Sequence, residues 1–219
     1  MSKRIAILGT GVVGNTIGSK LIQCGYEVKM GARTANNEKA AAWVKTNGDS
    51  ASQGTFAEAA AFGEIIFNCT KGDISIDALT LAGAKNMEGK IIVDLANPLD
   101  FSKGMPPSLI PSLSNTNSLG EEIQKTFPAS KVVKTLNTMS CNLMVNPLLV
   151  PDDHDVFICG NDEGAKASIK QLLTKDFNWE TIVDLGDITG ARGTEMLLPV
   201  WLRLWGVHKS PNFNFSIVH

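Results

Sequence analysis

The stretch "KRIAILGTGVVGNTIGSKLIQCG", Lys3–Gly25, decides the fold. An apolar run from Ile5 to Leu8 leads into a glycine-rich turn, and an amphipathic stretch then continues to Gly25. This order predicts a buried strand, a tight turn and a helix of about three turns that ends at a glycine. The glycine spacing is GxGxxG, which in this setting is typical of a dinucleotide-binding turn.

Each glycine of the turn has its own expected part. Gly9 permits the sharp turn, Gly11 lets the backbone approach a pyrophosphate, and Gly14 allows the helix to pack closely on the strand. The free N–H groups and the positive dipole end of the helix then face the phosphates. The predicted cofactor contacts of the turn are Gly9, Thr10, Gly11, Val12, Val13 and Gly14.

The next stretch, "YEVKMGARTANNEK", 26–39, indicates which dinucleotide binds. An NAD site places Asp or Glu after the second strand, roughly 20 residues past the glycines, where it binds the ribose 2′-hydroxyl. Here Arg33 and Thr34 follow the strand, and no carboxylate comes before Glu38. Arg33 can bind a 2′-phosphate through two charge-assisted hydrogen bonds. We therefore expect NADP(H) rather than NAD(H), the alternative being a solvated surface arginine.

Composition restricts the class of protein. The 219 residues are 43% hydrophobic and 19% charged, as in an ordinary water-soluble globule. A net charge of −2 and the lack of a basic run argue against a nucleic-acid partner. The first apolar run is too short for a signal peptide, and no apolar stretch is long enough to span a membrane, so we expect a cytoplasmic protein.

Cysteines and histidines offer little chemistry. Four cysteines without a CxxC pair predict reduced, mostly buried thiols, and a redox role stays open only for Cys69, at a strand end. The three histidines lie far apart, which predicts no metal site: His154, His208 and His219.

Apolar strands alternate with helical stretches along the rest of the chain. Strands are predicted at 5–8, 27–30, within 49–55, and at 64–70, 90–97, 131–137, 155–160 and 181–186. Helices are predicted near 36–48, 56–63, 74–87, 119–126, 162–177 and 191–205, with a Pro- and Ser-rich loop at 101–117. This alternation predicts an α/β fold, a doubly wound Rossmann-type, mostly parallel sheet with a small C-terminal lobe. We expect an NADP-binding domain over 1–140, and over 141–219 an extension of the sheet with a helical acceptor-site lobe.

Ligands of open parallel sheets bind at the carboxyl ends of the strands. Three further strand ends carry small and amide-bearing residues suited to a nicotinamide pocket, although such residues also form ordinary turns and caps. The predicted contacts there are Cys69, Thr70, Lys71, Ala96, Asn97, Pro98, Asn137, Thr138 and Met139. Lys71 is the one ionisable residue expected at these ends, and a weak candidate for proton transfer. With no nucleophile elbow and no paired carboxylates, we assign no catalytic residue and expect hydride transfer by alignment of two cofactors.

Six segments of the chain together resemble a known family: "ILGTGVVGNTIGSKL", "MGART", "VDLANPLD", "KVVKTLNTM", "VFICGNDEGAK" and "GARGTEMLLPVWL". The chain resembles the NADP-dependent reductases of the deazaflavin coenzyme F420, and the resemblance also extends to the oxidoreductase domain of the six-transmembrane metalloreductases. The resemblance implies that Arg33 binds the 2′-phosphate and that a C-terminal lobe with Arg192, Met196 and Leu197 helps to form the acceptor pocket. It also implies a homodimer. Two departures, Ala32 for a serine and Asn37 where a lysine often contacts the phosphate, predict a less strict preference for NADP.

The expected function is an oxidoreductase that transfers hydride between NADPH and a small-molecule acceptor of the deazaflavin or flavin type. Two alternatives stay open. One is an NADPH-binding redox sensor without turnover, and the other is a dehydrogenase of a small hydroxy or imino acid with Lys71 as the proton donor.

Overall fold

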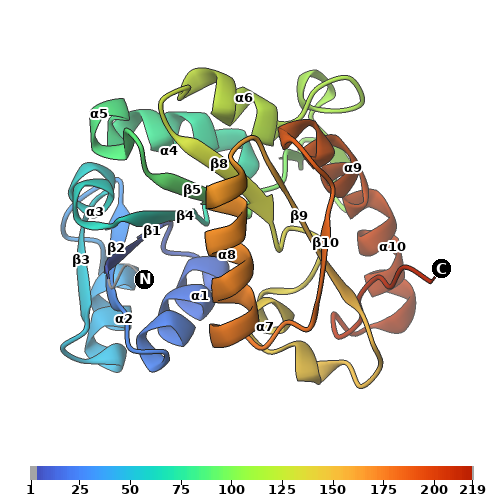
Figure 1. Cartoon of the computed structure of the whole chain (residues 1–219), viewed down its shortest axis with the longest axis horizontal. Coiled ribbons are helices and arrows are strands. Elements are labelled where there is room, and N and C mark those ends of the chain that lie inside the picture. The colour runs from blue at the N-terminus through green and yellow to red at the C-terminus, as the bar shows by residue number, and fades with distance from the viewer. Residues whose placement is uncertain (1–3, 219) are drawn as a thin grey trace.

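The computed structural model describes residues 4–218, and its centre is one eight-stranded sheet (Figure 1). The strand order is β10-β9-β8-β5-β4-β1-β2-β3. Neighbouring strands are parallel except for β8 and β9, which are antiparallel. The bounds are β1 Arg4–Leu8, β2 Glu27–Ala32, β3 Ala51–Thr55, β4 Ile65–Asn68, β5 Ile91–Asp94, β8 Lys131–Thr135, β9 Asp155–Gly160 and β10 Thr181–Asp184. The predicted doubly wound Rossmann-type sheet is confirmed.

Helices cover both faces of the sheet. Figure 1 shows α1, α7 and α8 on one side and α4, α5 and α6 on the other. The helices are α1 Val12–Gln23, α2 Glu38–Asn47, α3 Phe56–Phe62, α4 Ser75–Ala82, α5 Ala84–Met87, α6 Leu119–Thr126, α7 Cys141–Val145, α8 Glu163–Asp176, α9 Ala191–Met196 and α10 Leu198–His208. Two short strands form an antiparallel pair, β6 Leu99–Asp100 just before the expected 101–117 loop and β7 Ser108–Leu109 inside it.

The two apolar layers follow from the period of two along each strand. Ile5 and Ile7 of β1 belong to the cluster that includes α1, α2 and α8, whereas Ala6 and Leu8 belong to the cluster that includes α3, α4 and α6. Successive side chains of a strand point to opposite faces, and a parallel strand buried on both sides therefore reads as one continuous apolar run. This is why "IAIL" identified the strand without alternation.

Two predicted helices are each divided in two. The helix expected at 74–87 breaks at Gly83, whose φ of +86° lies in the left-handed region that ends a helix. The helix expected at 191–205 forms α9 and α10, which meet at Leu197 just before Pro199. A proline has no N–H to donate back along the helix, so the regular ladder is interrupted there.

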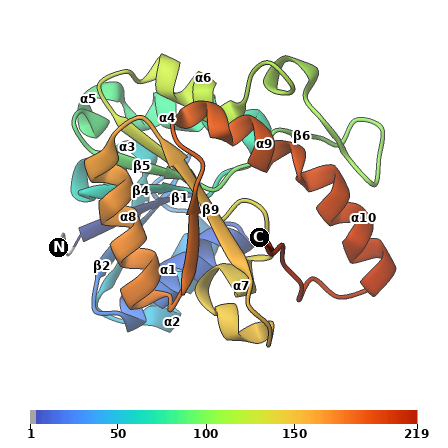
Figure 2. The same ribbon diagram turned by 45° about the vertical axis from the view of Figure 1, so that its right-hand side comes forward.

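The C-terminal segment returns to the sheet after α10. Figure 2 shows α9 beside α6 and α10 extending away from the sheet. Phe213 stacks on Trp201 with ring centroids 5.4 Å apart, and the N–H of Asp155 donates to the carbonyl of Phe215 at 2.9 Å. The tail thus packs as an ordered cap on α10 and the start of β9. Among residues 4–218, no helix is both long enough and apolar enough to cross a membrane.

Candidate functional site

The glycine turn joins β1 to α1 at the carboxyl edge of the sheet. Gly9 has φ +121°, and a Cβ there would lie 2.7 Å from the carbonyl oxygen of Cys69. A Cβ on Gly14 would lie 2.1 Å from the carbonyl oxygen of Gly9. Both positions therefore require glycine, for the turn and for close packing of helix on strand, as the sequence predicted.

Gly11 differs from the other two glycines because its surroundings are open. A Cβ on Gly11 would meet no atom within 4 Å. Gly11 is the N-cap residue of α1, and the first N–H groups of this helix donate no hydrogen bond to a capping side chain. The side-chain amide of Asn15 donates to the carbonyl of Thr10 at 3.3 Å, and this hydrogen bond stabilises the turn. The start of a 12-residue helix thus presents backbone to an open space, which fits a bound pyrophosphate.

The end of β2 lies directly beside this turn. The N–H of Gly9 donates to the carbonyl of Gly31 at 3.1 Å, so the residues after Ala32 continue past the glycines. Arg33 and Thr34 are exposed there. Asn37 caps α2, where its side-chain oxygen accepts from the N–H of Ala40 at 3.1 Å. The cap occupies this oxygen and leaves the amide nitrogen as the donor that Asn37 can offer to a phosphate.

The strand ends expected to form the nicotinamide pocket are brought together by the strand order β1-β4-β5-β8. Backbone hydrogen bonds join Cys69 to Leu8 at 2.9 Å and Leu95 to Asn68 at 3.2 Å. Thr70 and Asn97 are half-buried and Lys71 is exposed, whereas Ala96, Pro98, Thr138 and Met139 are buried.

Asn97 and Asn137 form a reciprocal pair across the ends of β5 and β8. Asn97 Nδ2 donates to the carbonyl of Asn137 at 2.8 Å, and Asn137 Nδ2 donates to Asn97 Oδ1 at 2.9 Å. Leu136, just before this pair, has φ +62°, an uncommon conformation for a branched residue. The two amides thus join the ends of β5 and β8, through the backbone carbonyl of Asn137 and the side-chain oxygen of Asn97.

The thiol of Cys69 is poorly suited to redox chemistry. Burial raises its pKa, and the nearby carboxylate of Asp94 raises it further, so the thiol stays protonated. The four cysteines are free thiols. Within residues 4–218, no group of three His, Cys, Asp or Glu side chains is arranged to hold a metal ion, and His219 lies outside the described residues.

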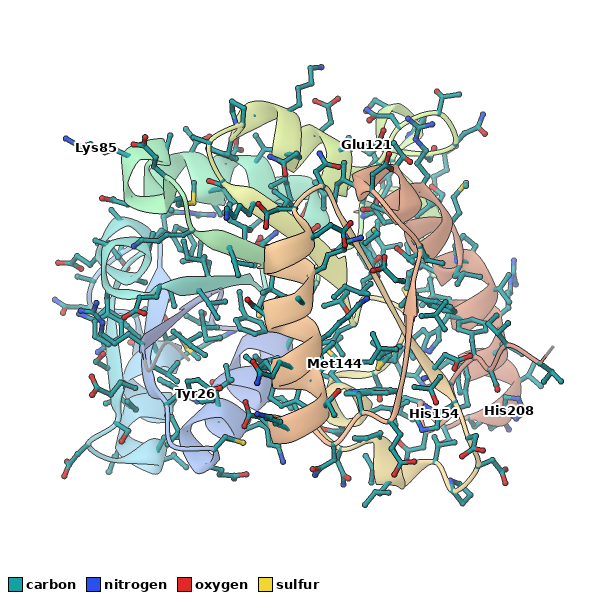
Figure 3. All side chains as sticks on the ribbon, viewed as in Figure 1. Tyr26, Lys85, Glu121, Met144, His154 and His208 are labelled. Atoms are coloured by element: carbon teal, nitrogen blue, oxygen red, sulfur yellow. The ribbon has the colours of Figure 1, made fainter. Side chains whose placement is uncertain are left out.

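The residues expected around the acceptor lie on α9 and at its junction with α10. The guanidinium of Arg192 is held by Glu121 of α6, with Nε 2.8 Å from Oε2 and Nη2 2.5 Å from Oε1. Figure 3 labels Glu121 where α6 lies beside α9. Met196 is 40% exposed and Leu197 is half-buried. The structure thus commits Arg192 to an ion pair that the sequence did not predict, because the two residues are 71 positions apart.

The sequence analysis also missed a buried polar network. Asp94 is the last residue of β5, and Lys134 is the next-to-last residue of β8. Lys134 forms ion pairs with Asp94 and with Glu195 of α9. A charged residue inside the runs "IIVD" and "KVVKT" was the available signal, because a charge between buried positions must find a partner.

Comparisons with known proteins indicate the family of the chain. Residues 4–98 match the family model described as NADP oxidoreductase, coenzyme F420-dependent. A crystal structure from Arthrobacter sp. FB24, provisionally named an F420-dependent NADP reductase, is 51% identical, with a TM-score of 0.93 over 100% of both chains.

Two curated proteins are also similar. The F420-dependent NADP reductase of Methanocaldococcus jannaschii is 29% identical over 68% of this chain and 69% of its own length. The metalloreductase STEAP3 of Rattus norvegicus is 29% identical over 90% of this chain, which spans only 38% of that protein. The full-length likeness at 51% identity, together with the family model over residues 4–98, identifies the chain as a member of the coenzyme F420-dependent NADP oxidoreductase family.

Proposed function

We propose that this protein transfers hydride between NADPH and a planar acceptor of the deazaflavin or flavin type. The observation that carries the proposal is the placement of three features along one sheet edge. These are the open glycine turn, Arg33 on the neighbouring strand end, and the Asn97–Asn137 pair at the far end. The glycine turn would lie at the pyrophosphate of NADPH, Arg33 at its 2′-phosphate and the Asn97–Asn137 pair at its nicotinamide.

Particular groups of the chain would hold the cofactor. The backbone of residues 9–14 would bind the pyrophosphate, with the free face of Gly11 against it. Arg33, Thr34 and the Nδ2 group of Asn37 would bind the 2′-phosphate. The residues around Thr70, Asn97 and Pro98 would orient the nicotinamide. The bound cofactor supplies the hydride, and the protein supplies orientation and excludes water.

The polar groups beside the nicotinamide position favour alignment over acid-base chemistry. Asn97 and Asn137 bond to each other, and Thr70 Oγ1 donates to Asn68 Oδ1 at 2.6 Å. Lys71 is exposed and lies outside this set of contacts. An acceptor that takes hydride directly at a conjugated ring needs little proton transfer from the protein, which fits these residues better than reduction of a carbonyl does.

The C-terminal residues 141–219 are proposed as the lobe that completes the acceptor site. This region contributes β9 and β10 to the sheet and places α9 against α6. Helix α10 exposes Val200, Trp205 and Val207, an apolar surface that would suit a homodimer contact.

NADPH oxidation with purified protein tests the proposal. FMN, FAD and the oxidised deazaflavin coenzyme are offered in turn as acceptors, with NADH as the control donor. We expect steady-state turnover with at least one of these ring systems and a preference for NADPH. Tight NADPH binding without turnover on any of them would instead support a redox sensor. Turnover of a small hydroxy or imino acid that is lost in Lys71→Ala would support the dehydrogenase.

A further inference from the structure

A buried ion network lies beneath the proposed nicotinamide position. Asp94 of β5 and Lys134 of β8 are direct neighbours in the sheet, and Lys134 Nζ lies 2.8 Å from Asp94 Oδ2. The same ammonium lies 2.8 Å from Glu195 Oε1 of α9. All three side chains are 0 to 1% exposed. Around them the layer is apolar, with Ile92, Val132, Leu119 and Ile188 among its members.

Each charge in this network has its hydrogen-bond partners. Lys134 Nζ also donates to the carbonyl of Ala96. Asp94 Oδ1 accepts from Asn68 Nδ2 at 2.8 Å and from the N–H of Ala96 at 3.2 Å. Both oxygens of Glu195 accept from the first N–H groups of α6, at Leu119 and Gly120. A fully satisfied polar network fixes one arrangement of its members.

The opposite charges also stabilise one another in their ionised forms. Burial alone would lower the pKa of Lys134, but Asp94 and Glu195 outweigh it and raise that pKa, so the ammonium stays charged. Burial raises the pKa of Glu195, and Lys134 opposes this shift. The second carboxylate is further balanced by the positive end of the α6 dipole.

The network joins three parts that hydride transfer would have to align. The Ala96 carbonyl precedes Asn97, one half of the amide pair under the nicotinamide position. Asn68 extends the network to Thr70, whose hydroxyl donates to Asn68 Oδ1 at 2.6 Å. Glu195 lies on α9, between Arg192 and Met196 of the proposed acceptor lobe. Lys134 Nζ therefore contacts both the segment after β5, at the Ala96 carbonyl, and helix α9, at Glu195.

A buried ion group is weak evidence of a contribution to stability. Uncharged residues of similar volume often replace a buried ion group at no cost to the folded state, because desolvation offsets most of the attraction between the charges. An ion group retained in an apolar layer is therefore better explained by the geometry that it enforces.

We propose that Lys134 is a positioning residue which, through Ala96 and Glu195, sets the nicotinamide-bearing strand end and α9 at the separation needed for hydride transfer. This inference rests on the proposed function. Lys134 does not contact the reacting atoms. It acts through the backbone at Ala96 and through Glu195, and a displacement of about 1 Å between two reactants can cost on the order of 100-fold in rate.

The test is a neutral triple variant, Asp94→Asn with Lys134→Met and Glu195→Gln, which avoids leaving one buried charge alone. A control of the same residue types exists in α8 and β10, where Lys166 is 2% exposed and lies between the exposed Glu163 at 2.8 Å and the partly buried side chain of Asp184 at 3.1 Å. The control variant is Glu163→Gln with Lys166→Met and Asp184→Asn. It changes the same residue types away from the proposed site.

Two measurements, kcat for acceptor reduction and the fluorescence lifetime of bound NADPH, are compared between these variants, and the Kd for NADPH serves as the check on binding. In the network variant we expect kcat for acceptor reduction to fall at least about tenfold, while the Kd for NADPH stays within about threefold. The fluorescence lifetime of bound NADPH should also change, because the nicotinamide end is loosened while the 2′-phosphate end is held. The control should match the wild type in both. A network variant with wild-type kcat and lifetime would overturn the inference.

Two further outcomes are also decisive. Should the triple variant fail to fold, Glu195→Gln alone keeps the Lys134–Asp94 pair and weakens only the link to α9. A lower kcat at unchanged NADPH affinity would support the inference, and a wild-type kcat would overturn it. Should the wild type reduce no acceptor, the proposed function fails, and the NADPH lifetime still decides whether the network positions the nicotinamide.

Discussion

Asn97 and Asn137 each donate an amide hydrogen to the other residue, across the carboxyl ends of two neighbouring strands. The pair links the ends of β5 and β8 at the sheet edge where the proposed nicotinamide pocket lies. Both residues had been predicted as cofactor contacts, and the structure adds that they also bind one another. The pair can therefore act on a ligand by holding the two strand ends together, with the Asn137 carbonyl and the Asn97 side chain as the acceptors.

Removal of this pair should weaken cofactor binding as well as folding. Asn97→Ala removes two hydrogen bonds, and we expect the free energy of unfolding to fall by about 1–3 kcal/mol. Asn86→Ala is the matched control, because Asn86 also donates two hydrogen bonds, to the carbonyls of Ala82 and Ala57 in helices α4 and α3 rather than at the ends of β5 and β8. Denaturant melts and NADPH titrations should show lower stability in both variants but weaker NADPH binding only in Asn97→Ala. Equal NADPH affinity in the two would contradict the placement of the nicotinamide.

The glycines at positions 9 and 11 should respond differently to a methyl group. Gly9→Ala meets the Cys69 carbonyl and requires a strained φ, so we expect a loss of about 1–3 kcal/mol or more in stability. Gly11→Ala meets no protein atom, so the variant should melt near the wild type. Its new methyl group would occupy the space of the pyrophosphate and reduce NADPH binding. Calorimetric titration of folded Gly11→Ala checks this, and wild-type affinity would show that the dinucleotide lies elsewhere.

Arg33 should distinguish NADPH from NADH. Its loss removes charge-assisted hydrogen bonds to a phosphate worth about 1.5–3 kcal/mol, so Arg33→Ala should raise the Kd for NADPH by roughly 10- to 100-fold. The Kd for NADH should change little, since NADH has no 2′-phosphate. Lys45→Ala, at an exposed lysine in the last turn of α2, controls for the loss of one surface charge. An equal loss for both cofactors would assign Arg33 another role.

Asp184 should make stability depend on pH at the acidic end. Although burial opposes it, hydrogen bonds from Lys170, the N–H of Gly186 and Lys166 lower the pKa of Asp184 to about 2. A folded-state pKa below the unfolded value of about 3.9 stabilises the fold above that unfolded value, and the contribution disappears as pH falls through the folded-state value. We expect Asp184→Asn to cost on the order of 1–2 kcal/mol near neutral pH.

The comparison of wild type and Asp184→Asn across pH tests this assignment. The difference between their free energies of unfolding should be constant from neutral pH down to about 4 and should then shrink toward about pH 2. A difference that does not vary over this range would show that the ion pairs of Asp184 contribute nothing through its charge.

The sequence alone was sufficient to predict where the strands lie along the chain and that the sheet is mostly parallel. Buried parallel strands read as apolar runs, and the turn at residues 9–14 needs glycine for reasons that lie within a few residues of it. The two divided helices show the limit of this reasoning. Gly83 and Pro199 are visible in the sequence, but a long apolar period suggested that each helix continued across them.

Only the tertiary structure decided how residues distant in the chain are partnered. The Asn97–Asn137 pair, the Arg192–Glu121 ion pair and the Lys134 network join positions between 40 and 71 residues apart. Local periodicity and turn chemistry depend on neighbours within about one turn or one strand. They were therefore sufficient to predict the glycine turn at residues 9–14. The partners of a buried charge depend on which strands lie side by side and where a later helix returns, and these depend on packing of the whole chain.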